Sequence, residues 1–352
     1  MDKKARIYIA GHRGLVGSAL VRRLQAEGYA NLLLRTSKEL DLRRQADVEA
    51  FFEKERPEYI FLAAAKVGGI IANNTYKAEF IYDNILIAAN VIQSAYKYGV
   101  RKVLNLGSTC IYPSLALQPM REEYLLTGSL EPTNEPYAIA KISAIKLCRY
   151  YNEQYGTNFI SVMPTNLYGI NDNFNLETSH VLPALIRKFH LAKLLATNEL
   201  EAIIKDIRKY PLGFGLTNRD GEDKDSIKNL LMQYGITEKK VTLWGSGNPS
   251  REFLYIDDLA EACVFLMENY SYKEIGEFVN IGTGEEVTIK NLANIIKDIV
   301  RFNGYIAFDS TKPDGTPRKV ADVSRIKALR WEAKTTLEVG LRKTYEWYVS
   351  NV

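Results

Sequence analysis

Residues 7–17 have the sequence IYIAGHRGLVG, a short apolar run followed by glycines at positions 11, 14 and 17. The apolar run is typical of a buried strand, and the residues after it have the pattern of a helix. Glycines at such a junction allow a tight turn and close approach of the backbone to a pyrophosphate, whose oxygens the unpaired N–H groups of the helix bind. The junction therefore predicts a dinucleotide-binding turn formed by Gly11, His12, Arg13, Gly14, Leu15, Val16 and Gly17.

Strand and helix patterns continue to alternate through the first half of the chain. Further strands are expected at Asn31–Arg35, Tyr59–Ala65, Lys102–Leu106 and Phe159–Met163, and helices at Asp47–Lys54, Phe80–Lys97 and Tyr137–Tyr155. This alternation predicts an α/β protein with a Rossmann fold, a doubly wound parallel sheet covered by helices on both faces. Such a sheet binds its ligands at the carboxyl ends of its strands.

The alternation loosens after Gly169 and returns at the strand Phe253–Ile256, the helix Asp258–Glu268 and the strand Glu277–Asn280. A helix is expected at Leu176–Leu195. We predict that residues 1–170 and 252–284 form an NADP-binding Rossmann domain. Residues 171–251 and 285–352 would form a smaller, mixed α/β substrate domain.

The composition is that of an ordinary globular protein. The 352 residues include 46 basic and 42 acidic side chains, a net charge of +4 that is too small to indicate nucleic acid but suits an anionic substrate. No apolar stretch is long enough to span a membrane, and three scattered cysteines argue against disulfides, so a cytoplasmic protein is expected. No group of residues has metal-ligand spacing, so no metal is predicted.

The second strand ends on an arginine where an NAD site normally places an acid to bond the ribose 2′-hydroxyl. Arg35, with Arg13 in the glycine turn, would supply two guanidiniums whose planar forks match the oxygens of a 2′-phosphate. Two solvated surface arginines would give the same pattern. The arrangement favours NADPH as the cofactor. Asp41 and Leu42, which follow, fit either an adenine contact or a helix cap.

Tyr137 and Lys141 are four residues apart in an expected helix, so the phenol and the ammonium share a face. A nearby cation lowers the pKa of a phenol, which would let Tyr137 act as an acid or base. Ser108, just beyond the strand Lys102–Leu106, would reach the same edge and bond the same carbonyl oxygen. A surface pair on a helix would have the same spacing.

These motifs, with Arg251-Glu252-Phe253 and Asp257-Asp258, resemble the extended short-chain dehydrogenases that act on nucleotide sugars. More narrowly, the chain resembles the GDP-L-fucose synthases, which are GDP-4-keto-6-deoxymannose epimerase-reductases. The likeness covers nearly the whole chain outside residues 190–240. The further matching segments are 10–18, 63–70, 72–76, 107–113, 131–141, 163–169, 179–180, 244–247 and 312–319.

The resemblance implies reduction of the C4 ketone of a GDP-linked 4-keto-6-deoxy sugar by NADPH. Tyr137 would protonate the oxygen, Lys141 would hold the nicotinamide ribose, and Cys110 and His180 would exchange protons at C3 and C5. It also implies cofactor contacts at Ala63, Ala64, Ala65, Pro164, Asn166, Leu167 and His180. Substrate contacts would come from Ser108, Cys110, Lys188, Trp244, Arg251 and Lys312.

Several of these residues also have ordinary structural interpretations. Cys110 alone would be taken for a small buried hydrophobe, although on an extended segment it would face the same side as Ser108. His180 precedes an expected helix and would serve as a cap. Cys148 and Cys263 fall on apolar helical faces and are expected in the core.

The segment at about 190–240 departs from the compact members of the family, and its ranges Glu199–Lys209 and Asp225–Tyr234 are expected to be helical. It would lie beside the sugar, so a bulkier GDP-linked 4-keto-6-deoxyheptose is an alternative to the hexose that gives GDP-L-fucose. The resemblance further implies bacterial surface polysaccharide biosynthesis and a homodimer, while the charge and the apolar pattern predict no nucleic acid or membrane partner. Whether C3 and C5 are epimerised, or only C4 reduced, stays open.

Two other functions compete with this prediction. A nucleotide-sugar 4-epimerase or dehydratase would retain NAD, which the Arg13 and Arg35 pair opposes, and a dehydratase would want an acid where Cys110 stands. A non-catalytic NADPH sensor would not need Ser108, Tyr137 and Lys141 together.

Overall fold

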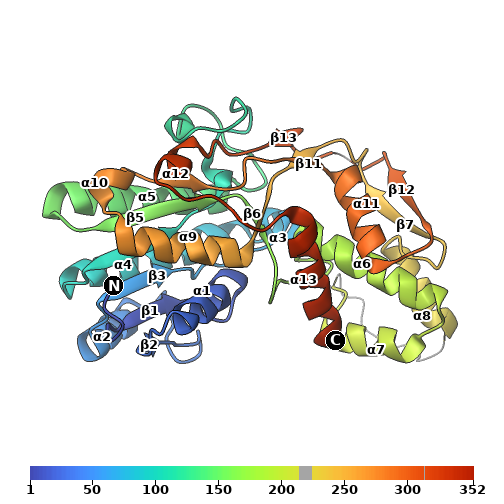
Figure 1. Ribbon diagram of the computed structural model, residues 1–352, viewed down its shortest axis with the longest axis horizontal. Helices are drawn as coiled ribbons and strands as arrows, with labels where there is room; N and C mark the ends of the chain where they lie inside the picture. The colour runs from blue at the N-terminus through green and yellow to red at the C-terminus, as the bar shows by residue number, and fades with distance from the viewer. Residues whose placement is uncertain (214–223, 313) are drawn as a thin grey trace. The chain divides into compact units, whose positions relative to one another are not determined.

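The computed structural model describes residues 1–213, 224–312 and 314–352, which divide into two units (Figure 1). Unit 1 comprises Met1–Leu167, Phe253–Gly284 and Val320–Thr335, and unit 2 comprises Tyr168–Glu252, Glu285–Lys319 and Thr336–Val352. The predicted division placed every residue after 284 in the second domain. The structure differs, because Val320–Thr335 returns to unit 1, where the Met120 N–H donates to the Val320 carbonyl oxygen at 2.8 Å.

Unit 1 is built on a sheet of six parallel strands in the order β10-β5-β4-β3-β1-β2. The strands are β1 Ile7–Ala10, β2 Leu32–Leu33, β3 Tyr59–Leu62, β4 Lys102–Leu106, β5 Phe159–Pro164 and β10 Val279–Ile281. The chain winds outward from β1 in both directions, so the strand order reverses between β1 and β3. Such a reversal opens a ligand crevice at the carboxyl ends of these strands.

Helices cover both faces of this sheet, as the alternating sequence predicted. Side chains alternate along a strand, so Ile7 and Ile9 pack with one group of helices while Tyr8 and Ala10 pack with the other. The first group contains α1 Leu15–Ala26 and α9 Ile256–Asn269. The second contains α2 Gln45–Glu55, α4 Lys77–Lys97 and α5 Glu135–Tyr155. The doubly wound Rossmann fold is confirmed.

Shorter elements connect the strands and helices of unit 1. They are α3 Ile70–Thr75, η1 Thr109–Ile111, η2 Glu122–Tyr124, β6 Asn166–Tyr168, β9 Phe253–Tyr255, α10 Tyr272–Ile275 and α12 Ser324–Ala328. Cys148 and Cys263 are buried in the core of unit 1, as expected.

Unit 2 is mixed α/β. Its helices are α6 Val181–Ala196, α7 Leu200–Lys209, α8 Lys224–Gln233, α11 Ile289–Val300 and α13 Leu337–Ser350. Its strands are β7 Lys240–Trp244, β8 Ser250–Arg251, β11 Val287–Thr288, β12 Tyr305–Asp309 and β13 Arg318–Lys319. β7 pairs with β12 in parallel, and β8 lies between β11 and β13. None of the described helices is long and apolar enough to cross a membrane.

Helix α6 begins five residues later than the predicted helix Leu176–Leu195. The Asn175 Oδ1 atom accepts hydrogen bonds from the N–H groups of Glu177 and Thr178 at 2.9 and 3.1 Å, which closes a turn in place of a helix. His180 then has extended backbone, with φ −74° and ψ 168°, and is the N-cap of α6.

The two helices expected in the segment 190–240 are present as α7 and α8, and residues 214–223 of the segment lie outside the described residues. A fully buried ion pair attaches α7 to α6, because the Arg187 Nε atom donates to Asp206 Oδ1 at 2.9 Å. The Tyr348 hydroxyl of α13 also donates to Asp206. The segment is therefore anchored in the core of unit 2.

Candidate active site

The glycine turn after β1 has the geometry that a bound pyrophosphate requires. Gly11 has φ +82°, and a Cβ on it would lie 2.9 Å from the Ala64 Cα, while a Cβ on Gly17 would lie 2.1 Å from the Gly11 carbonyl oxygen. Gly14 is the N-cap of α1; among the described residues no side chain caps this helix, and no acid occupies its first turn. The N–H groups of the first turn are therefore available to an anion, and the turn fits a dinucleotide.

The two predicted arginines lie around this turn. Thr36 hydrogen bonds, and then the charges of Arg35 and Arg13, hold the pKa of the Glu39 carboxyl below its usual value, so both guanidiniums act on one carboxylate. The Nη2 atom of Arg35 is 2.8 Å from Glu55 Oε1, and its guanidinium lies 5.7 Å from the Phe51 ring centroid. Both partners belong to α2.

Glu55 and Phe51 were not predicted as partners of Arg35. They are four residues apart in α2 and share a face, but the predicted helix ended at Lys54 and left Glu55 out. His12, the third side chain of the turn, has a buried Nδ1 atom that finds no hydrogen-bond partner among the described residues. Burial, followed by the charge of Arg13, lowers the pKa of His12, so this imidazole is neutral at pH 7.

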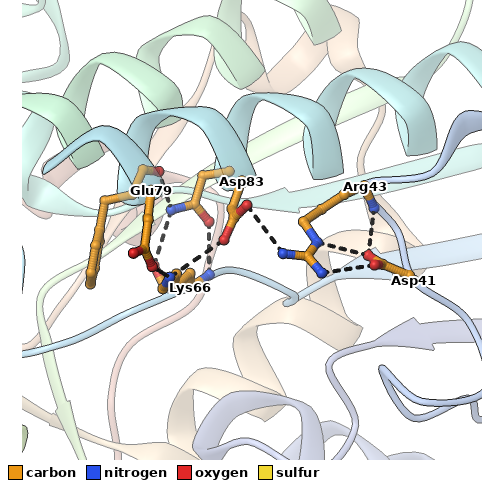
Figure 2. Close-up of polar contacts among 7 residues, drawn as sticks. Asp41, Arg43, Lys66, Glu79 and Asp83 are labelled. Atoms are coloured by element: carbon orange, nitrogen blue, oxygen red, sulfur yellow. Dashed lines mark hydrogen bonds and ion pairs between the residues drawn. The ribbon is translucent and has the colours of Figure 1, made fainter. Parts of the chain in front are cut away.

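Of the other predicted cofactor residues, Ala63 and Ala64 lie beside the turn. The Ala63 N–H donates to the Ala10 carbonyl oxygen at 3.1 Å, which extends the pairing of β1 and β3 toward Ala64 and Ala65. Asp41 forms a two-pronged ion pair with Arg43, at 2.9 Å from Nε and 2.8 Å from Nη2 (Figure 2). Hydrogen bonds from Arg43 lower the pKa of Asp41. Leu42, the next residue, is buried.

Tyr137 and Lys141 lie in the first two turns of α5, as their spacing predicted. Lys141 is buried, its Nζ atom donates to the Leu106 carbonyl oxygen at 2.7 Å, and it lies 5.6 Å from the Tyr137 ring centroid. Leu106 ends β4, so this bond ties the ammonium to the carboxyl edge of the sheet, next to Ser108. Burial lowers the pKa of Lys141 to about 8.

The predicted lowering of the Tyr137 pKa was wrong for this structure. Burial of the phenol, followed by the charge of Cys110, raises the pKa of Tyr137, because loss of water disfavours the phenolate. Tyr137 is therefore a neutral phenol, which can give a proton but is not a strong base.

Ser108 and Cys110 do not lie on one extended segment, which corrects the prediction. Ser108 is extended, with φ −162° and ψ 146°, but Cys110 belongs to the single turn η1. The Ser108 Oγ atom accepts a hydrogen bond from the Cys110 N–H at 3.4 Å. This turn still places the two residues side by side, and Cys110 is buried against α5 in a cluster that includes Tyr137.

Pro164, Asn166 and Leu167 extend the same edge. Pro164 is the last residue of β5, and the Thr165 N–H donates to the Ile281 carbonyl oxygen at the end of β10, at 3.0 Å. Asn166 and Leu167 follow in β6 and are half-buried. Unit 1 thus carries the glycine turn, Ser108, Cys110, Tyr137 and Lys141 at the carboxyl ends of its strands.

The remaining candidates belong to unit 2. His180 is exposed at the start of α6, and Lys188 is half-buried on the same helix, with its Nζ atom donating to the Tyr234 carbonyl oxygen at 2.9 Å. Burial lowers the pKa of Lys188 to about 8. The contact with Tyr234, just after α8, could not be read from the sequence, since the two residues are 46 positions apart.

Trp244, Lys312 and Arg251 gather around the loop after β12. Trp244 is 61% exposed, and the Lys312 Nζ atom lies 5.6 Å from the centroid of its ring. The Arg251 Nη1 atom donates to the Thr316 carbonyl oxygen at 2.6 Å. Asp314 was not predicted to contribute to this site. Its carboxylate accepts hydrogen bonds from the Ser246 N–H and hydroxyl at 2.8 and 2.7 Å, and these bonds join the loop to the segment just after Trp244. An exposed aromatic ring with two cations suits a nucleoside diphosphate.

Across the part of the chain that the structure describes, no group of three or more His, Cys, Asp or Glu side chains is placed to hold a metal ion.

Comparisons with known proteins agree with this geometry. The model of the NAD dependent epimerase/dehydratase family matches residues 7–206 and 207–282. GDP-L-fucose synthase 1 of Arabidopsis thaliana is 53% identical over 351 residues, which cover 100% of this chain and 95% of that protein.

Two solved structures from Campylobacter jejuni are also similar. A GDP-6-OMe-4-keto-L-xylo-heptose reductase is 41% identical, with a TM-score of 0.93, covering 100% of this chain and 99% of that chain. A GDP-D-glycero-L-gluco-heptose synthase, solved in the presence of NADPH, is 41% identical with a TM-score of 0.86, covering 99% of each chain.

Proposed function

The chain belongs to the NAD dependent epimerase/dehydratase family and, within it, to the GDP-L-fucose synthases, and on that premise we propose that it is an NADPH-dependent reductase of the C4 ketone of a GDP-linked 4-keto-6-deoxy sugar. The observation that carries the proposal is the group formed by Tyr137, Lys141 and Ser108 at the carboxyl edge of the unit 1 sheet. This group stands in the same unit as a glycine turn whose backbone and uncapped helix fit a dinucleotide.

The protonation states support a reductase that delivers a proton as the ketone is reduced. NADPH, when bound, supplies the hydride to C4. Tyr137 is a neutral phenol and donates its proton to the ketone oxygen, while the Ser108 hydroxyl bonds the same oxygen. Lys141 stays mainly protonated at pH 7, and its charge stabilises the phenolate that remains.

Cofactor binding follows from the residues around the glycine turn. The first turn of α1 would hold the pyrophosphate, and Arg13 and Arg35 would hold the 2′-phosphate. The charges of both arginines act on a single carboxylate, Glu39, which supports a site for that group. A retained-NAD epimerase or dehydratase gains no support from this arrangement.

We further propose that Cys110 and His180 exchange protons at C3 and C5 before reduction. The ketone at C4 acidifies these positions, and a thiol and an imidazole are suitable bases for such carbon acids. Cys110 lies two residues from Ser108 in unit 1, and His180 is exposed at the start of α6 in unit 2. Lys188, Trp244, Arg251 and Lys312 would bind the GDP moiety.

A heptose is the second candidate sugar, because the heptose reductase of C. jejuni aligns with a TM-score of 0.93. The segment 190–240 does not decide between the sugars. The match to the Arabidopsis protein spans 351 residues and 100% of this chain, so that segment has a counterpart in a protein named for fucose. The expectation that the segment sets this chain apart is therefore wrong for that relative.

We also propose a homodimer, formed through α4 and α5. These helices present exposed aromatic side chains that include Tyr82, Tyr96 and Tyr155, and the last two rings stack at 4.2 Å. Exposed aromatic side chains of this kind favour association over exposure to water.

The direct test is to incubate the purified protein with NADPH and a panel of GDP-linked 4-keto-6-deoxy hexoses and heptoses. We expect NADPH oxidation with at least one sugar of the panel. Tyr137→Phe should reduce that rate by about 10²–10⁴-fold, because it lacks only the donated proton, while NADPH binding is retained. Oxidation by Tyr137→Phe at the wild-type rate would rule out Tyr137 as the acid.

A further inference from the structure

Helix α4 is hydrogen-bonded to the loop that follows β3. Asn84 is only 5% exposed, and its side chain bonds both main-chain groups of one residue: Oδ1 accepts from the Lys66 N–H at 2.8 Å, and Nδ2 donates to the Lys66 carbonyl oxygen at 3.0 Å. The Asn84 amide thereby satisfies the two main-chain groups that a neighbouring strand would satisfy within a sheet. It fixes the position of Lys66 relative to α4.

The same helix also holds the loop that follows β2. The Asp83 carboxylate lies between two cations, 3.4 Å from Arg43 Nη1 and 3.5 Å from Lys66 Nζ (Figure 2). Later in α4, the buried Asn90 donates from Nδ2 to the Leu42 carbonyl oxygen at 2.9 Å. The polar edge of α4, defined as Asp83, Asn84 and Asn90, therefore joins residues 41–43 to residue 66.

The loop after β3 abuts the glycine turn. Lys66 lies two residues beyond Ala64, and the Ala64 backbone is so close to Gly11 that a Cβ there would lie 2.9 Å from Ala64 Cα and N. A shift of the Ala63–Lys66 loop toward or away from β1 would change the space beside the turn. The position of this loop is therefore part of the shape of the dinucleotide site.

We propose that Asn84, assisted by Asp83, is a positioning residue for the cofactor. Asn84 is buried beneath the loop and acts through Lys66; it holds the loop in its binding geometry before the cofactor arrives. Asp83 links this loop to the one carrying Asp41 and Leu42. The entropy of ordering both loops is lost on folding rather than on binding, which is the benefit of preorganisation. The inference rests on the proposed function only in taking NADPH as the ligand.

The chain contains a matched control for this test. Asn152 on α5 is 7% exposed and bonds both main-chain groups of Phe159, accepting from its N–H at 2.8 Å and donating to its carbonyl oxygen at 2.7 Å. Phe159 begins β5, so this clamp lies at the amino-terminal edge of the sheet. Asn84→Leu and Asn152→Leu each remove a pair of bonds to both main-chain groups of one residue, at different edges of the sheet. Each variant also loses one further bond, from Asn84 Nδ2 to the Phe80 carbonyl oxygen or from the Thr157 hydroxyl to Asn152 Oδ1.

The experiment measures NADPH binding to the full chain by fluorescence titration, beside thermal unfolding without ligand and steady-state kinetics. Both Leu variants should lose comparable thermal stability. Only Asn84→Leu should raise the dissociation constant of NADPH, by about tenfold, since loss of one well-placed anchor is worth about 1.4 kcal/mol. Its kcat at saturating NADPH should stay within about twofold of wild type, as expected when only binding is affected.

Asp83→Asn serves if Asn84→Leu does not fold, because it keeps the shape of the side chain and removes only the charge between Arg43 and Lys66. Its NADPH dissociation constant should rise by about threefold, as for a lost partly exposed ion pair. Unchanged NADPH binding in both variants, or an equal rise in Asn152→Leu, would overturn the inference. A wild-type protein that does not bind NADPH would overturn the proposed function instead.

Discussion

Arg35 is the residue at which cofactor choice should be most sensitive to substitution. Arg35→Ala should weaken binding of NADPH by about 1.5–3 kcal/mol, the worth of charge-assisted bonds to a phosphate, and leave NADH nearly unchanged. The ratio of kcat/KM for the two cofactors measures this. Arg44→Ala is the control, since Arg44 is the N-cap of α2 and pairs with Asp47 in the first turn of that helix. Equal losses for NADPH and NADH would contradict the assignment of Arg35.

Lys141 should make cofactor binding depend on pH. Its pKa of about 8 means that the buried ammonium loses its proton as the pH rises through 8, so the affinity for anionic NADPH should fall by up to about tenfold per pH unit above it. Titration of NADPH binding between pH 6.5 and 9.5, without sugar, measures this effect. Constant affinity up to pH 9.5 would contradict it.

The effect of Lys141 on stability has the opposite sign. A pKa lowered from 10.5 means that the unfolded chain binds this proton more tightly, so this residue favours folding increasingly as the pH rises from about 8 to 10.5. Unfolding caused by Lys141 therefore cannot imitate a loss of NADPH binding in that range. Thermal unfolding along the same pH series separates the two.

At the scale of elements, α6 and α7 depend on one buried ion pair. Asp206→Ala should lower the free energy of unfolding by about 3–5 kcal/mol, because Arg187 would remain as an uncompensated charge with no exposed surface. Urea unfolding measures it. The double variant Arg187→Met/Asp206→Leu should recover most of the loss, since an apolar pair of similar volume is often neutral. A double variant no more stable than Asp206→Ala would show that packing, not charge, is lost.

The turn η1 shows how a local element changes the chemistry expected of it. An extended segment would have placed Ser108 and Cys110 on one side by alternation alone. The structure brings them together through the hydrogen bond between the Cys110 N–H and Ser108 Oγ. Ser108 therefore also holds the Cys110 backbone, so its replacement would disturb the thiol as well as the ketone contact.

At the scale of the whole molecule, the two residues proposed for epimerisation belong to different units, Cys110 to unit 1 and His180 to unit 2. Reaction in deuterated water should place deuterium at C3 and C5, and Cys110→Ser should remove ring deuterium while NADPH still binds. Mass analysis of the product measures this. Unlabelled product formed at the full rate by Cys110→Ser would make the enzyme a C4 reductase only.

Assembly is the second property at this scale. Light scattering at micromolar concentration should give the mass of two chains, about 80 kDa from 39.9 kDa per chain. Tyr82→Glu, on the exposed face of α4, should shift the protein toward the monomer by placing a charge in the contact. A wild-type protein of single-chain mass would refute the homodimer.

Much of unit 1 could be predicted from the sequence because its signals are local. Glycines at 11, 14 and 17 after an apolar run, and Tyr137 four residues before Lys141, are spacings that secondary structure converts directly into shared turns and faces. The positions of the parallel strands followed from the same alternation. The recognised motifs of a known family then carried the prediction from fold to substrate class.

Tertiary structure alone decided the properties that depend on partners distant in the sequence. The raised pKa of Tyr137 and the lowered pKa of Lys141 come from burial, which spacing does not reveal. Arg35 forms an ion pair with Glu55, and Lys188 donates a hydrogen bond to the Tyr234 carbonyl oxygen. Asn84 forms hydrogen bonds with both main-chain groups of Lys66. A sequence specifies which groups are present and their local periodicity. Their charge states and partners depend on which other segments exclude water from them, and folding of the chain determines that.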